Sequence, residues 1–252
     1  MIFHETGRAD GPVVILLHGG GLSDWSWGTV ATGLADAYRV VTPIIDGHGE
    51  DAEETFDTIR ASAEKLVGWI DETCDGRVRL LAGLSLGAQI AVQTLALHTD
   101  AADCCLLESA LTVPMKSTAR MAGPTYRLCG ELIRQKWFST LQAKSMGLPE
   151  DMREAYFRDT SRMSTASLVN MTRSNSDFPL PAGLSGVRAK TLILVGSKEL
   201  QVMRRSAEML HEALPGSTLH VAQGMKHGEM SLRHPQEYLA LVRGVLAAQE
   251  NA

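Results

Sequence analysis

The sequence predicts an α/β fold, a mostly parallel central sheet covered by helices on both faces. Short apolar runs rich in β-branched residues alternate with segments whose apolar residues recur every three or four positions. The short runs are solidly apolar, which is typical of parallel strands buried on both faces. Six strands are therefore expected, at residues 13–17, 39–44, 78–81, 102–107, 191–195 and 218–221.

Helices are predicted in most of the intervals between these strands. An exception to the regular alternation lies between residues 107 and 191, which hold helix-like patches at 124–141 and 150–162 but no strand. A structureless loop of that length is uncommon in a compact domain. We therefore interpret residues 109–189 as an inserted helical cap, and residues 1–108 with 190–252 as the core domain. The clearest helical spacing elsewhere is at 24–35, 58–73, 86–97, 202–213 and 236–248.

Length, composition and charge exclude several classes of protein. The chain has 252 residues, of which 44% are hydrophobic and 21% charged, which suits one large globular domain. Its net charge of -5 argues against general binding to nucleic acid or to anionic membranes, which needs a surplus of Lys and Arg. No apolar run approaches the roughly 18 residues of a membrane span, and the N-terminus lacks a signal-peptide pattern. We expect a cytoplasmic monomer or homodimer.

The sequence predicts neither a metal site nor an organic cofactor. The four cysteines have no C-x-x-C spacing, and two of them are adjacent, so we interpret them as free thiols. No glycine-rich nucleotide-binding string is present. The cysteines are Cys74, Cys104, Cys105 and Cys129.

A candidate nucleophile, Ser85, lies in the segment 83–87, Gly-Leu-Ser-Leu-Gly. The segment follows a predicted strand and opens a predicted helix. A serine on such a sharp turn needs glycines two positions before and two after it, because side chains there would collide with the backbone. The helix N-terminus beside it favours developing negative charge. The alternative interpretation is a tight glycine turn with a helix-capping serine.

A second glycine-rich segment, His-Gly-Gly-Gly at 18–21, directly follows the first predicted strand. Bare backbone can approach a ligand closely and turn amide N–H groups toward it. Alone, the segment is equally well interpreted as a flexible turn. Together with Ser85 it favours an oxyanion-binding loop, because acyl transfer needs two donors that converge on one oxygen.

Three segments in this order, 18–21, 46–49 (Asp-Gly-His-Gly) and 83–87, resemble the α/β-hydrolase superfamily. The resemblance implies a triad in the order serine, acid, histidine. Glu199 matches the acid position in Gly-Ser-Lys-Glu at 196–199, with Glu in place of the usual Asp, and His227 matches the base in Gly-Met-Lys-His at 224–227. The family also implies an oxyanion hole made by the amides of Gly20 and Leu86. The N-terminus is too short for the first hairpin of many members, so one or two early strands are expected to be missing.

Alternatives to these assignments remain open at this point. Glu108 ends a strand at another edge position from which some members supply the acid, and Asp177 is a further candidate. His234, which precedes a proline at the expected start of the last helix, competes with His227 as the base. His18 and His48 are expected to hold the geometry of their loops.

The resemblance implies a serine hydrolase that cleaves a small or medium carboxylic ester through an acyl-enzyme. Its expected partner is a small-molecule acyl substrate. Carbon–carbon or thioester hydrolysis by the same triad is an alternative, because related members perform both. A binding protein without activity on the same fold is another.

The predicted cap differs in composition from the core. Residues 109–189 hold six of the eleven methionines and six of the thirteen aromatic residues, which suits either a lid over an acyl pocket or a small core of its own. They also hold 11 Lys/Arg and 6 Asp/Glu, a net charge of +5 against -10 for the rest. We interpret this asymmetry either as selectivity for anionic substrates or as complementary charge between cap and core.

Overall fold

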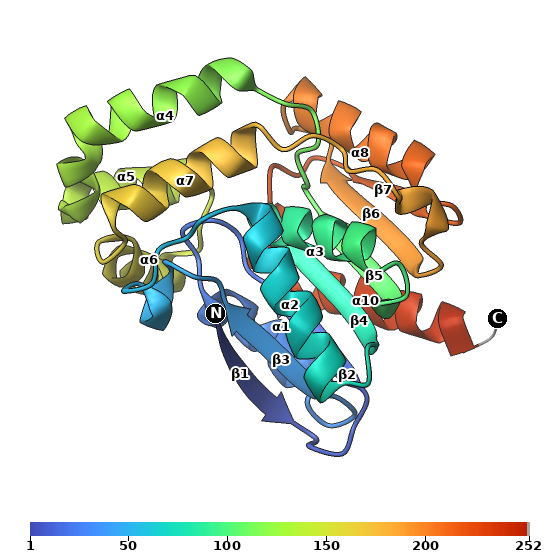
Figure 1. The fold of residues 1–252 in the computed structure, drawn as a ribbon. Coiled ribbons are helices and arrows are strands. Elements are labelled where there is room, and N and C mark those ends of the chain that lie inside the picture. Colours follow the sequence, from blue (N-terminus) through green and yellow to red (C-terminus); the bar gives the residue numbers. More distant parts are fainter. Residues whose placement is uncertain (251–252) are drawn as a thin grey trace.

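The computed structural model describes residues 1–250 and contains one sheet of seven strands in the order β1-β3-β2-β4-β5-β6-β7. Strands β2 to β7 run parallel, and β1 pairs antiparallel with β3 (Figure 1). The six predicted strands and the predicted fold class are confirmed. The strands are β1 (Ile2–Gly7), β2 (Val13–Leu17), β3 (Arg39–Ile44), β4 (Val78–Leu84), β5 (Ala102–Glu108), β6 (Lys190–Gly196) and β7 (Thr218–Ala222).

Strand β1 was not among the predicted strands. Its sequence, Ile-Phe-His-Glu-Thr-Gly, has no solid apolar run, because it lies at the edge of the sheet and is half-buried or exposed along its length. Antiparallel edge strands need less burial than the parallel strands at the centre. We expected one or two early strands to be missing; within residues 1–250 a single strand precedes β2.

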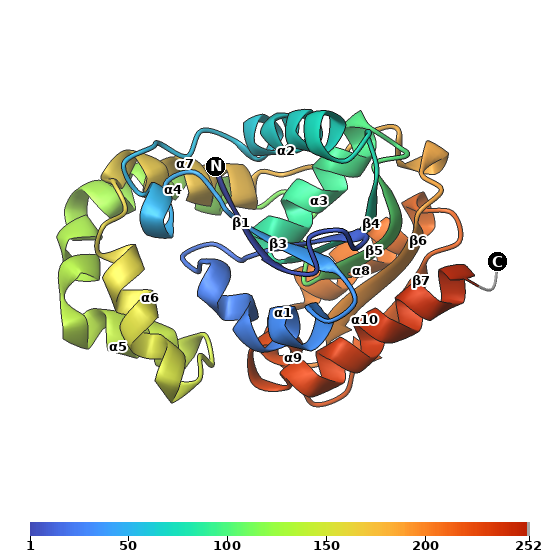
Figure 2. The same cartoon turned by 90° about the horizontal axis from the view of Figure 1, so that it is seen from below.

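The two faces of the sheet are buried by different helices. Successive residues of β2 alternate between the faces: Ile15 belongs to an apolar cluster with residues of α2, α3 and α8, and Val14 belongs to a second cluster with residues of α1 and α10. Figure 2 shows α2 and α3 above the sheet and α1 and α10 below it. Burial on both faces explains the solidly apolar strands. The helices are α1 (Gly28–Leu34), α2 (Ile59–Thr73), α3 (Leu86–Leu97), α8 (Gln201–Ala213), α9 (Glu229–Arg233) and α10 (Pro235–Glu250), with short 3-10 turns η1 (Asp24–Trp27) and η2 (Gly49–Asp51).

Between β5 and β6 the chain forms an inserted layer of helices beyond the carboxyl ends of the strands (Figure 1). The expected patch at 124–141 was wrong in its bounds. Pro124 lies inside α4 rather than at its start, and the helix breaks at Gly130. Helix α7 was missed, although Ser164 caps it by accepting from the Ser167 amide at 3.0 Å. The elements are α4 (Lys116–Cys129), η3 (Gly130–Arg134), α5 (Lys136–Ser145), η4 (Glu150–Met152), α6 (Arg153–Thr160), α7 (Thr165–Ser176) and η5 (Leu184–Gly186).

The parallel strands deliver their following loops to one edge of the sheet. The turns after β2, β4, β5, β6 and β7 therefore meet beneath the inserted helices. Among the helices of residues 1–250, none is both long enough and apolar enough to cross a bilayer.

Candidate active site

Ser85 occupies the turn between β4 and α3 in a conformation that few non-glycine residues adopt. Its φ is +53° and its ψ is -111°, and its amide donates to the Glu108 carbonyl at 2.8 Å. The flanking glycines are needed sterically. A Cβ on Gly83 would lie 2.5 Å from the Gly87 carbonyl carbon, and a Cβ on Gly87 would lie 2.6 Å from the His18 oxygen. The backbone thus holds the Ser85 hydroxyl at the edge of the sheet.

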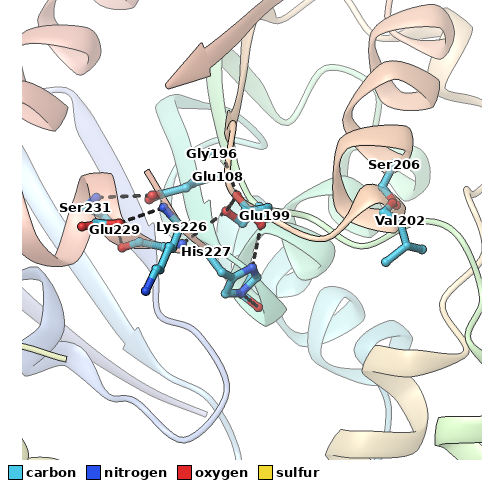
Figure 3. A network of polar contacts seen from close by, with 12 residues as sticks. Glu108, Gly196, Glu199, Val202, Ser206, Lys226, His227, Glu229 and Ser231 are labelled. Carbon is cyan, nitrogen blue, oxygen red and sulfur yellow. Dashed lines mark hydrogen bonds and ion pairs between the residues drawn. The ribbon is translucent and has the colours of Figure 1, made fainter. Parts of the chain in front are cut away.

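His227 lies in the loop after β7 and connects two side chains from other strands. Its Nε2 lies 3.0 Å from Ser85 Oγ. Its Nδ1 lies 2.8 Å from Glu199 Oε2, a contact drawn as a dashed line in Figure 3. A carboxylate on Nδ1 fixes the tautomer in which Nε2 is free to accept a proton. The His227 side chain is 46% exposed, so this part of the site is open to solvent. His234 instead precedes α10 and contacts Glu237 at 3.2 Å.

Glu199 is fully buried and receives hydrogen bonds at both carboxylate oxygens. Its Oε1 accepts from the Gly196 amide at 2.7 Å and from Ser109 Oγ at 2.8 Å, while Oε2 faces His227. Burial acts to raise the pKa of Glu199, but these donors together hold the pKa below its ordinary value. The carboxylate is therefore ionised at neutral pH and oriented on the imidazole.

The competing acids do not contact the histidine. Glu108 is 2% exposed, and its Oε1 accepts from the Ser231 amide at 3.3 Å. Burial raises the pKa of Glu108 to about 7. Asp177 is an exposed residue at the C-terminal end of α7. The geometry therefore brings Glu199, rather than Glu108 or Asp177, to His227.

Sequence reasoning missed Ser109, which links the parts of the site. Its φ is +57°, and its hydroxyl donates to Glu199 and accepts from the Gly228 amide at 3.4 Å. Ser109 thus contacts the acid and the loop of the histidine, and the preceding residue, Glu108, contacts the Ser85 amide. Backbone strain of this kind collects at functional sites. A lone serine after a strand carries no sequence motif that could have identified it.

The glycine loop after β2 is held by His18. This buried histidine places Nδ1 2.9 Å from the Gly19 carbonyl oxygen, and its Nε2 accepts from the Ile45 amide at 3.0 Å. Burial and the neighbouring His48 lower the pKa of His18 to about 3, so it stays neutral. His48 bonds back to its own loop, with Nδ1 3.0 Å from the Asp46 carbonyl oxygen. Both histidines hold loop geometry.

Gly20 and Leu86 lie close together beside the serine. A Cβ on Gly20 would lie 3.8 Å from Leu86 Cδ2. Leu86 is the first residue of α3, so its amide has no acceptor inside the helix. The two predicted oxyanion donors therefore come from neighbouring turns.

The inserted helices contact this loop through side chains. A Cβ on Gly20 would lie 3.0 Å from Met171 Sδ of α7, and one on Gly21 would lie 3.4 Å from Tyr156 of α6. Other large side chains of the insertion pack on each other around Ile133 and Met163. The insertion therefore packs on the glycine loop and also forms a small apolar cluster of its own, against which Met171 packs as well.

A cavity of 1150 Å³ lies elsewhere, between α2, α3, α4 and α7. Its lining includes Gln93 and Leu97, from the second half of α3, but not Ser85 at the start of that helix. It is therefore a separate feature from the serine site.

The sheet order, the strained turn after β4 and the inserted helices define an α/β-hydrolase fold. Residues 14–241 match the alpha/beta hydrolase family, and the chain belongs to it. The family assignment identifies the chain as a hydrolase.

A relative in sequence and two solved structures are consistent with this family assignment. An esterase of Mycobacterium tuberculosis is 27% identical over 253 residues, which cover 93% of this chain and 83% of the relative. The solved structure of a thermophilic esterase from Thermogutta terrifontis matches with a TM-score of 0.74 at 21% identity, over 98% of this chain and 93% of that one. An enol-lactonase from Burkholderia xenovorans LB400 matches with a TM-score of 0.81 at 16% identity, over 98% and 96%. At these identities the structural matches establish the fold.

Proposed function

We propose that the protein is a serine hydrolase that cleaves small or medium carboxylic esters through an acyl-enzyme intermediate. The observation that carries the proposal is the chain of contacts from Ser85 Oγ to His227 at 3.0 Å and from His227 to the buried Glu199 at 2.8 Å. Nucleophile, base and orienting acid within hydrogen-bond reach are the requirements of this chemistry.

In the acylation step Ser85 Oγ attacks the ester carbonyl carbon, and its proton passes to His227 Nε2. Glu199 stabilises the imidazolium through Nδ1. The amides of Gly20 and Leu86 donate to the oxyanion of the tetrahedral intermediate. When this intermediate collapses, the bond to the alcohol oxygen breaks, and His227 returns the proton to that oxygen, so that the alcohol leaves.

Deacylation repeats the sequence with water as the nucleophile. His227 takes a proton from the water, whose oxygen attacks the acyl carbon. The second intermediate then collapses, the bond to Ser85 Oγ breaks, and the serine regains its proton from the imidazolium. The products are the carboxylic acid and the free enzyme.

Labelling with a fluorophosphonate tests the nucleophile. We expect labelling of the wild-type protein and none of Ser85→Ala, with ester hydrolysis reduced about 10⁴-fold or more. An unlabelled but folded wild type, or a label that survives in Ser85→Ala, would overturn the proposal. Esters of increasing acyl length, with a matched thioester, then define the substrate.

The acid is tested by a pair of matched variants. Glu199→Gln should lower kcat about 10³-fold or more, because the amide no longer stabilises the charged imidazole. Glu108→Gln should keep kcat within about tenfold of wild type, because Glu108 does not touch the imidazole. The reverse ranking would assign the acid to Glu108.

A further inference from the structure

The outer part of the insertion exposes an unusual concentration of large apolar side chains. Leu128 is 86% exposed, Trp137 62% and Leu141 59%. Six of the nine exposed large hydrophobic residues found in residues 1–249 fall within residues 116–146, which form α4, η3 and α5. We call this segment the cap rim; Figure 1 shows it at the side of the insertion away from the sheet. The six residues are Met121, Leu128, Leu132, Trp137, Leu141 and Met146.

The cap rim also carries the positive charge of the insertion. It contains six Lys or Arg residues and a single acidic residue, Glu131, a net charge of +5. The other residues of 109–189 hold five basic and five acidic residues and are neutral. The net charge of -5 for the whole chain therefore conceals a strongly basic, apolar segment. The basic residues are Lys116, Arg120, Arg127, Arg134, Lys136 and Lys144.

Among the described residues, the ion pairs of these cations do not reach the acidic core. The ion pairs found for the rim in the described chain join Arg134 to Glu131 and Lys136 to Glu154, and both lie within the insertion. Arg127 and Lys144 are exposed, and residues 1–249 offer neither of them an ion-pair partner. Lys116 and Arg120 line the cavity between the insertion and the core together with Asp57, whereas the exposed Arg127 and Lys144 have no such acidic neighbour among the ion pairs of the described residues.

We propose that the cap rim docks on an anionic lipid surface. Helices that lie at a membrane interface combine exposed Trp and Leu, which enter the headgroup boundary, with Lys and Arg, which pair with anionic headgroups. The rim has both features over two consecutive helices, and its exposed Arg127 and Lys144 lack acidic partners among the described residues of the core. An acidic protein would satisfy the charge, but the exposed Leu128 and Trp137 side chains suit a hydrocarbon boundary better.

The proposal brings the hydrolase close to esters dissolved in a bilayer. The same insertion places Met171 of α7 against the glycine loop, so a docked rim would hold the serine site on the other side of the inserted helices from the lipid surface. This consequence rests on the proposed function, whereas the docking itself does not.

Vesicle binding of the Ser85→Ala protein tests the docking apart from catalysis. Trp137 is the reporter, because the other three tryptophans are buried or half-buried. We expect vesicles with 30 mol% phosphatidylglycerol to sediment the protein and brominated lipids to quench its fluorescence. Binding should weaken about tenfold or more on pure phosphatidylcholine and in high salt.

Matched variants locate the contact. Leu128→Ser with Leu141→Ser, and Arg127→Gln with Lys144→Gln, should each weaken vesicle binding about tenfold or more. The controls are Leu200→Ser, which changes an equally exposed leucine outside the rim, and Lys190→Gln with Arg205→Gln, which removes the same charge. These control variants should bind anionic vesicles as tightly as the Ser85→Ala protein does.

Three results would overturn the proposal. The first is absence of sedimentation with anionic vesicles, and the second is equal loss of binding in rim and control variants. The third is self-association that the double leucine variant abolishes while vesicles bind nothing, which would make the rim an interface between copies of the chain. Sedimentation velocity of the free proteins distinguishes this last case.

Discussion

The core and the insertion approach the serine site in different ways. In the core, a side chain on Gly83, Gly87 or Gly196 would strike backbone atoms. Where the insertion meets the glycine loop, the neighbours are side-chain atoms of Met171 and Tyr156. Backbone contacts cannot yield without moving a strand, whereas a methionine side chain can change rotamer at little cost. The core therefore fixes the candidate catalytic groups, whereas the side chains of the insertion are free to change conformation.

Among the variants that test this comparison, the largest effect is expected from breaking a backbone contact of the core. Gly87→Ala places a methyl group against the carbonyl oxygens of Leu17 and His18. The turn must shift, so we expect kcat/KM to fall about 10²-fold or more, or the protein to fail to fold. Gly68→Ala is the control, because a Cβ there meets nothing within 4 Å. Steady-state kinetics and thermal melting of both variants measure the difference, and an active Gly87→Ala would contradict the rigid core.

A smaller effect is expected from Ser109, a positioning residue. Ser109→Ala removes a donor from Glu199, which should lower kcat about tenfold with little change in KM. The pKa of Glu199 should rise with one donor fewer, so the loss of activity that follows protonation of this carboxylate should begin at a higher pH. Ser139→Ala is the control, since its buried hydroxyl lacks a partner in the described structure. An unchanged pH profile would leave Ser109 a merely structural role.

For Glu108, the effect on the core is expected in the free energy of unfolding rather than in the reaction rate. Its pKa is raised from an ordinary 4.5 to about 7, so the folded state disfavours the ionised form. Stability is therefore lost as pH rises from about 4.5 to about 7, by about 3 kcal/mol at most. Glu108→Gln cannot ionise and should lack this loss. Urea unfolding of both proteins at pH 4.5 and 8 measures this difference. An equal change in the free energy of unfolding between the two pH values for wild type and Glu108→Gln would contradict the prediction.

The smallest effect is expected in the insertion. Met171→Ala should shift the preferred acyl length and change KM a few-fold, while kcat for a short ester stays near wild type. Met163→Ala is the matched control. Met163 is 2% exposed within the insertion's own cluster, so its loss should cost about 2–5 kcal/mol of stability without changing acyl preference. Identical selectivity profiles for the two variants would remove Met171 from the substrate site.

The sequence identified the candidate site more completely than it identified the helices around it. Ser85 and its glycines obey a local steric rule, so their positions can be recognised without the fold. Glu199 and His227 were recognised through the resemblance to the α/β-hydrolase superfamily, whose members carry the acid and the histidine in matching segments after strands. Ser109 was not, because its contacts join residues 90 and 119 positions away along the chain.

The sequence by itself determined the α/β alternation, the strained turn at Ser85 and the presence of a helical insertion, because each depends on patterns within a few residues. The tertiary structure decided which carboxylate reaches His227, since Glu108 ends β5 and Glu199 follows the neighbouring strand β6, and only the packing of the loops distinguishes them. It also decided where the positive charge of the insertion lies. Composition gives only the net charge of the insertion. The exposure and ion pairing of its basic side chains depend on which faces of α4 and α5 the rest of the chain covers.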